Sequence, residues 1–252
     1  MDYNAYYGEV VALMLFLVMG IRLYRKGART RQRPERYLSA AFLLWALGYV
    51  LWDVPLLLTS DDWWLARSAF GGRVAINLGT LALALFIRSV FRPQSRWAFW
   101  FVAATGISLI GGIAASGWAG DWYGERPFDY AWYWPEMLAN IAPSAWMAVE
   151  GLIAYSSAKR RRRLGLCGAV TCNRLLLWGL AGVFWVGLEV VSFAQVLELT
   201  LIGRASVAVD VLMGLCEFVP VVLAWLAFFP PAAYRHWLES GRDTSGMSPT
   251  RA

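Results

Sequence analysis

The sequence has very few of the side chains on which most metal, redox and nucleophilic chemistry depends. Its only histidine is His236, close to the C-terminus, so no histidine base or ligand is available in the apolar part of the chain. This excludes bis-histidine haem, histidine-based zinc hydrolysis and Ser-His or Cys-His catalysis there. The only lysines, Lys26 and Lys159, lie between apolar stretches, which excludes a retinal Schiff base in the last stretch.

Charge is also scarce, because only 16% of the residues are charged while 59% are hydrophobic. Soluble domains carry charge on about 25% of their residues. No linker long enough to separate two domains occurs. Residues 1–238 are therefore predicted to form one transmembrane domain, and the tail 239–252, rich in Ser, Thr, Gly and Pro, is predicted to be disordered.

Long apolar stretches are what the sequence does have. A helix needs roughly 20 apolar residues to cross a bilayer, and seven stretches reach that length. They are Ala5–Leu23, Tyr37–Leu58, Ala69–Phe91, Trp97–Gly117, Tyr133–Ser156, Asn173–Val196 and Ala205–Phe229. The sequence therefore predicts an all-α fold, a seven-transmembrane helical bundle.

The basic residues predict the orientation of this bundle. Of 23 lysines and arginines, 19 fall on one side of the predicted membrane. The four on the other side are Arg67, Arg73, Arg126 and Arg204. The positive-inside rule places the N-terminus outside and the C-terminus in the cytoplasm, as in a multi-pass protein of a bacterial inner membrane. The net charge of +6 thus indicates topology and contact with anionic lipids rather than nucleic-acid binding.

Six of the carboxylic acids inside the predicted spans are taken as membrane-embedded candidates. They are Glu9, Asp53, Glu150, Glu189, Asp210 and Glu217. Acids in hydrocarbon are costly and usually face a cavity, so each is a functional candidate. Asp210 and Glu217 are seven residues apart and share one helix face, which is predicted to line a chamber with the outer half of the second helix.

Each acid also has a structural interpretation. Asp53 could form a buried ion pair with Arg73, which lies at a comparable depth on the next helix. Glu9 and Glu150 lie near helix ends and could face headgroups or arginines. Glu189 is intermediate between a structural and a functional interpretation. Asp210 and Glu217 are harder to explain in this way, because Arg204 is the only basic residue near their helix. A carboxyl group without a basic partner in a low dielectric is a candidate general acid.

Several tryptophans lie within the predicted helices rather than at their ends. Trp45, Trp52, Trp178, Trp185 and Trp225 are of this kind. They are either packing residues and interfacial anchors, or walls of a chamber whose ring faces stabilise a cation. A proton-donating acid beside such walls is the equipment for carbocation chemistry on an isoprenoid.

Three segments carry a resemblance to a known family. Trp52-Asp53-Val54-Pro55 resembles the Trp-acid motif in helix two of the small integral-membrane terpene cyclases of fungal meroterpenoid and indole-diterpene pathways and their actinobacterial relatives. The run from Cys216 to Leu223 is similar to the second acid motif of that family, and Ala75-Ile76-Asn77-Leu78-Gly79 to its Asn-Leu-Gly segment. The family usually has Glu in helix two and Asp in helix seven, so the two acids are exchanged here.

The resemblance implies a membrane terpene cyclase that protonates an epoxide or olefin of a farnesyl- or geranylgeranyl-type aromatic or indole substrate. Asp53 and Glu217 would be the catalytic acids, with Asp210 as a substitute for Glu217. Trp45, Trp52, Trp178, Trp185 and Asn77 would bind the substrate, and a pathway prenyltransferase would be a partner. We expect no metal and no cofactor, because Asp61-Asp62-Trp63-Trp64-Leu65 lacks the third acid of a magnesium-binding diphosphate motif.

Two other classes of function stay open. A proton-coupled transporter would also place acids at mid-membrane, but it usually shows an internal repeat. A seven-helix sensor or assembly subunit would need a partner to carry its output. The aromatic segment 118–132 is either an interfacial cap or a lid over a cavity.

Overall fold

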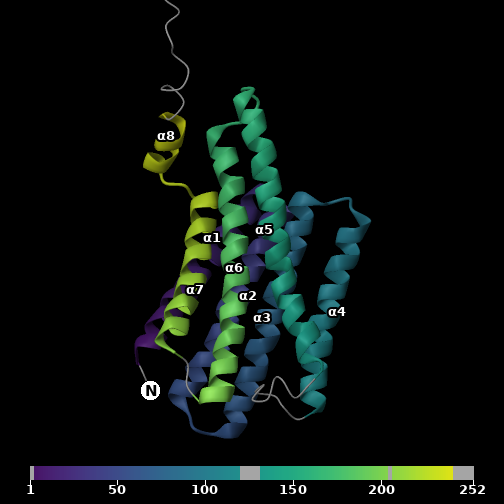
Figure 1. Ribbon diagram of the computed structural model, residues 1–252, viewed down its shortest axis with the longest axis vertical. Coiled ribbons are helices and arrows are strands. Elements are labelled where there is room, and N and C mark those ends of the chain that lie inside the picture. Colours follow the sequence, from purple (N-terminus) through teal and green to yellow (C-terminus); the bar gives the residue numbers. More distant parts are fainter. Residues whose placement is uncertain (1–2, 120–130, 204–205, 241–252) are drawn as a thin grey trace, which may run out of the picture.

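The described part of the chain contains eight helices and no strand. The computed structural model describes residues 3–119, 131–203 and 206–240, apart from the side chains of residues 3–9, 12, 53, 56, 57, 199–201 and 210. The helices are α1 (Tyr3–Thr30), α2 (Arg33–Leu58), α3 (Asp62–Phe91), α4 (Arg96–Trp118), α5 (Tyr133–Arg163), α6 (Ala169–Ile202), α7 (Val207–Phe228) and α8 (Ala232–Ser240) (Figure 1). The all-α prediction is confirmed for these residues. The cap or lid at 120–130 and residues 241–252 of the tail lie outside them.

Five of these helices are long and apolar enough to cross a membrane. Among the described residues, α3, α4, α5, α6 and α7 meet that criterion by length and composition. The shortest of them, α7, has 22 residues and is about 33 Å long at 1.5 Å per residue. This length matches the ~30 Å hydrocarbon core of a bilayer, so the chain has the helices of a membrane protein.

The helices extend beyond the predicted apolar stretches. α3 begins seven residues before Ala69, at Asp62, because the Asp61 side chain caps the helix by accepting a 3.0 Å hydrogen bond from the backbone N–H of Trp63. α5 continues past Ser156 to Arg163. Hydropathy detects only the part of a helix that is apolar, whereas the backbone hydrogen bonds continue into the polar region beyond it.

An eighth helix, which the sequence analysis did not predict, follows α7. Pro230 and Pro231 end the preceding helix, and α8 begins directly after them. The side-chain amide of Asn173 in α6 donates a 2.8 Å hydrogen bond to the hydroxyl of Tyr234 in α8. This contact fixes α8 beside the start of α6.

Six of the long helices form a closed ring, and α4 lies outside it. α1 packs against α2 and α7, and the ring continues from α2 to α3, α5, α6 and back to α7. α4 packs against α3 and α5 at the edge of the bundle (Figure 1). Its outer side chains remain exposed, such as Trp100 at 68% and Ile107 at 72%. The six ring helices therefore surround a common axis, and α4 lies outside them.

α5 and α6 approach each other closely through glycines. A Cβ atom at Gly151 would lie 2.6 Å from the backbone nitrogen of Gly179, and one at Gly182 would lie 2.5 Å from that of Ala148. Small residues at a helix crossing let two backbones touch, which is how membrane helices associate without a hydrophobic driving force. This crossing holds Asn140 and Ser144 of α5 and Glu189 of α6 on one side of the ring axis.

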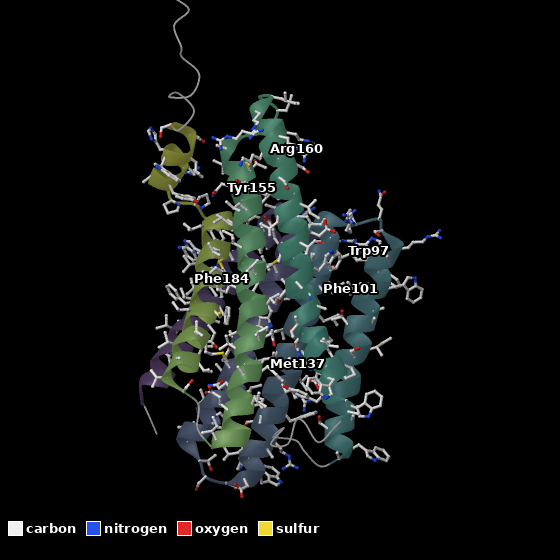
Figure 2. The ribbon with its side chains drawn as sticks, in the orientation of Figure 1. Trp97, Phe101, Met137, Tyr155, Arg160 and Phe184 are labelled. Atoms are coloured by element: carbon white, nitrogen blue, oxygen red, sulfur yellow. The ribbon has the colours of Figure 1, made fainter. Side chains whose placement is uncertain are left out.

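The basic segments collect at one end of the bundle. The turn between α5 and α6 lies at the end where α8 is found, and the turn between α2 and α3 lies at the opposite end (Figure 1). Arg160 marks the former end, whereas Met137 lies toward the latter (Figure 2).

Candidate functional site

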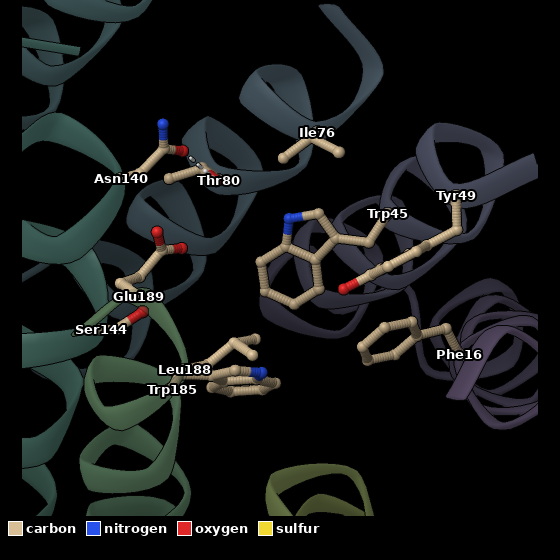
Figure 3. Close-up of a pocket in the computed structure, with 10 residues that line it drawn as sticks. All are labelled: Phe16, Trp45, Tyr49, Ile76, Thr80, Asn140, Ser144, Trp185, Leu188 and Glu189. Atoms are coloured by element: carbon tan, nitrogen blue, oxygen red, sulfur yellow. Dashed lines mark hydrogen bonds between the residues drawn. The ribbon is translucent and has the colours of Figure 1, made fainter. Parts of the chain in front are cut away.

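A cavity of about 60 Å³ lies inside the ring of helices, and we call it the axial pocket. Five helices, α1, α2, α3, α5 and α6, contribute its lining. The lining residues are Phe16, Trp45, Tyr49, Ile76, Thr80, Asn140, Ser144, Trp185, Leu188 and Glu189 (Figure 3). This volume holds a few water molecules.

Aromatic rings from α1, α2 and α6 form one side of the axial pocket (Figure 3). The ring centroids of Trp45 and Trp185 are 5.3 Å apart, and that of Phe16 is 5.9 Å from Trp45. Gly79 of α3 leaves room for this packing, since a Cβ atom there would lie 2.7 Å from the indole of Trp45. Both tryptophans were predicted to bind substrate, and the structure brings them together at the pocket.

Polar groups from α3, α5 and α6 form the other side (Figure 3). The hydroxyl of Thr80 donates a 2.9 Å hydrogen bond to the side-chain oxygen of Asn140. Glu189 points its carboxyl group into the same region, beside Ser144 (Figure 3). Within residues 3–119, 131–203 and 206–240, no hydrogen bond or ion pair reaches the carboxyl of Glu189. A partly buried acid that faces a cavity without such a partner is a functional candidate.

Glu217 of α7 reaches the axial pocket through a tyrosine. Its side chain is buried, with 4% exposure, and it accepts a 3.0 Å hydrogen bond from the hydroxyl of Tyr49. Tyr49 lines the pocket, so Glu217 lies behind the wall. α7 was predicted to form part of that wall, whereas the described lining comes from the other five ring helices.

A hydrogen-bonded network connects the polar side of the pocket to α4. Arg73 binds Glu136 through two nitrogens, with a 2.9 Å bond from Nε, and its third nitrogen donates to Ser116 at 2.8 Å. Asn77 donates to the same carboxylate at 2.8 Å, and the amide of Asn140 donates to Asn77 at 3.4 Å. Asn140 also accepts from Thr80, so the network ends at the pocket.

The partners of Arg73 are Glu136 of α5 and Ser116 of α4. The guanidinium uses all three nitrogens on Glu136 and Ser116. The alternative ion pair with Asp53 concerns a side chain outside the described residues. Glu136 was absent from the acids identified in the sequence, although it is 5% exposed within an apolar helix. Its position three residues into α5 made it look like a residue of the helix end.

The side chain of Asn77 makes hydrogen bonds that join α3 to α4 and α5. Its amide donates to Glu136 and, at 3.4 Å, to the backbone oxygen of Leu109 in α4. It also lines a second hollow of about 210 Å³, between α3 and α4, whose other lining residues are apolar. Asn77 therefore does not line the axial pocket.

The other predicted site residues are dispersed. Trp52 is 38% exposed, and Trp178 packs in the core, with ring centroids 5.0 Å from Phe86 and 5.1 Å from Phe228. Neither lines the axial pocket. The side chains of Asp53 and Asp210 lie outside the described residues. By backbone position, residue 53 follows Tyr49 by one helical turn on the same face of α2.

Glu150 has the structural role that its position near a helix end suggested. It accepts a 2.6 Å hydrogen bond from Nε of Arg92 and a 3.2 Å bond from the indole of Trp146. The hydrogen bond from Arg92 to this carboxylate raises the pKa of Arg92 above its ordinary value. This ion pair fastens the end of α3 to α5.

The chemistry available at the axial pocket is proton transfer. In the described part of the chain, no three His, Cys, Asp or Glu side chains are grouped as metal ligands. The pocket offers instead an acid, two indole faces, and hydroxyl and amide groups that can orient a small polar group or water. No protein-family model, no curated protein and no solved structure matches this chain.

Proposed function

We propose that the chain is a membrane terpene cyclase in which Glu189 donates the proton to a prenylated aromatic or indole substrate. One observation carries this proposal. The carboxyl of Glu189, which has no hydrogen-bonding or ionic partner in the described part of the chain, faces a cavity walled by Trp45 and Trp185. An acid beside indole faces is suited to forming a cation and then stabilising it.

The proposed reaction is an isomerisation. The O–H bond of Glu189 breaks as the proton is transferred to an epoxide oxygen or an olefin carbon of the substrate, which becomes cationic. Ring closure moves the positive charge along the prenyl chain, past the faces of Trp45 and Trp185. Loss of a proton to the Glu189 carboxylate restores the acid, so the product has the mass of the substrate.

The size of the axial pocket sets a condition on this reaction. Pockets for drug-sized ligands measure about 300–1,000 Å³, whereas the axial pocket measures about 60 Å³. The proposal therefore requires the pocket to widen when a prenyl chain enters. Ile76 and Leu188 are the aliphatic side chains of its lining and the ones whose rotamers would have to change.

The proposed topology has seven spans, with the N-terminus outside and the C-terminus in the cytoplasm of a bacterial cell. The five apolar helices α3 to α7 and the collection of basic turns at one end support it. A fluorescent-protein fusion at the C-terminus should be bright in this orientation, and a dark fusion that is present at full length would contradict it. A membrane prenyltransferase that supplies the substrate is a proposed partner.

The cyclase proposal predicts product formation without added metal. Membranes that contain the protein, incubated with farnesylated or geranylgeranylated aromatic acceptors, should yield a cyclised product of unchanged mass. The measurement is separation by liquid chromatography with mass detection. Membranes with the Glu189→Gln variant at equal abundance are the control. A substrate panel that gives no product with the folded wild-type protein would count against cyclisation.

A second function, proton-coupled transport, is favoured by the small volume of the axial pocket and by the network from Arg73 to Thr80. Both suit the passage of a proton or a small solute better than the binding of a prenyl chain. Proteoliposomes would then show flux driven by an acid gradient and lost in Glu189→Gln. Product formation and flux separate the two functions, although both depend on the same acid.

A further inference from the structure

The end of α1 forms a second site with a different chemistry. A hollow of about 410 Å³ is lined by Arg22, Arg25, Lys26, Arg29, Thr30 and Phe229, and we call it the basic pocket. Arg22 and Arg25 are each followed four residues later by another cation, Lys26 and Arg29, so the four project from one face of the last turns of α1. α7 ends beside them and supplies Phe229.

Aromatic rings of α7 lie beneath these cations. The guanidinium carbon of Arg22 is 4.6 Å from the ring centroid of Trp225 and 5.8 Å from that of Phe229. The ammonium group of Lys26 is 5.1 Å from the ring of Phe228. The basic pocket thus has a cationic rim and an apolar floor.

The positive charge of this rim is only partly neutralised. Lys26 pairs with Glu35 at 2.9 Å. Within the described residues, no carboxylate pairs with Arg22, Arg25 or Arg29, which are all exposed. Like charges three or four residues apart on a helix repel each other, so an anion at this position would stabilise the end of α1.

We propose that the basic pocket binds the phosphate of an anionic phospholipid headgroup. The rim supplies three guanidinium groups for the phosphate, and Phe229, the aromatic residue of the lining, supplies apolar contact for the glycerol and the first part of the acyl chain. Phe229 directly follows α7, a helix long and apolar enough to span a membrane, so the basic pocket lies at the end of a candidate span, where lipid headgroups are found.

The test measures lipid binding to the purified full-length protein in detergent. Phosphatidylglycerol is titrated while the thermal unfolding midpoint is recorded, because a ligand that binds the folded state raises that midpoint. Phosphatidylcholine and soluble glycerol 3-phosphate are titrated in parallel. The variant Arg25→Gln/Arg29→Gln removes two rim charges without touching an aromatic ring. The matched control Arg160→Gln/Arg161→Gln removes two charges from the last turn of α5.

We expect phosphatidylglycerol to raise the midpoint of the wild type and of the control variant at the same concentrations. In Arg25→Gln/Arg29→Gln the affinity should fall by about 30-fold, since each charge near a membrane surface contributes about a five-fold effect. Equal protection by glycerol 3-phosphate would identify a free phosphate as the ligand of the same site. Unchanged affinity in Arg25→Gln/Arg29→Gln, or an equal loss in both variants, would overturn the proposal.

Discussion

Replacing Glu189 by Gln is expected to lower the rate of substrate cyclisation by about 10²- to 10⁴-fold, the usual contribution of a general acid. Gln has the shape of Glu but no acidic proton. The carboxyl of Glu189 makes no described hydrogen bond or ion pair, so the variant should keep the unfolding midpoint of the wild type. The two measurements are initial rates in membranes and thermal unfolding of the purified protein.

Glu198→Gln is the control on the same helix. The carboxylate of Glu198 accepts hydrogen bonds from Ser206 at the turn between α6 and α7, away from the axial pocket, so this variant should keep its activity. Glu217→Gln should lose less activity than Glu189→Gln, because Gln can still accept the hydrogen bond from Tyr49. Full activity in Glu189→Gln with none in Asp53→Asn would move the proton donor to α2.

Replacing Glu136 by Ala is expected to lower the free energy of unfolding by about 3–5 kcal/mol. The variant leaves Arg73 charged and without its carboxylate, and the side chain of Arg73 is only 18% exposed. Asn77 also loses an acceptor. Denaturant titration in micelles measures the change. Glu150→Ala is the matched control, since its partner Arg92 is 45% exposed and water can solvate the charge that remains, so the loss of stability should be smaller than in Glu136→Ala.

Alanine substitutions at two adjacent glycines of α4 test the contact of this helix with the network of Arg73 and Glu136. A Cβ atom at Gly112 would lie 2.2 Å from a carboxylate oxygen of Glu136, whereas a Cβ atom at Gly111 would meet nothing within 4 Å. Gly112→Ala should therefore displace Glu136 and destabilise the protein as Glu136→Ala does. Gly111→Ala should stabilise α4 by up to about 1 kcal/mol through helix propensity. Equal effects of the two substitutions would mean that Glu136 does not depend on this contact.

The sequence predicts the helices better than their ends, for a physical reason. Apolar stretches of 20 residues are helical because no other structure satisfies their backbone in lipid, so the seven long helices all overlap the predicted spans. Their ends depend on local contacts such as the cap at Asp61, and α8 depends on a contact with Asn173. Hydropathy contains no information about the cap at Asp61 or about the contact between α8 and Asn173.

The candidate site was predicted only in part, because its residues come together through contacts between distant helices. Trp45 and Trp185 were identified by their position inside helices, and they do meet. Tyr49 was not identified, since its importance comes from Glu217, 168 residues away in the sequence. Glu189 was considered, but nothing in the sequence shows that Glu136 satisfies the nearby arginine and leaves Glu189 facing the cavity.

The position of α4 outside the ring has a consequence for how this sequence can change. A helix that closes no ring can be shortened, replaced or separated from the bundle while the other six still enclose the axis. What such a change must preserve is a pair of polar anchors, the hydroxyl of Ser116 for Arg73 and the backbone oxygen of Leu109 for Asn77. Sequence variation should therefore be concentrated on the lipid-facing side of this helix, with its limits set by these two hydrogen bonds and by the close approach of Gly112 to Glu136.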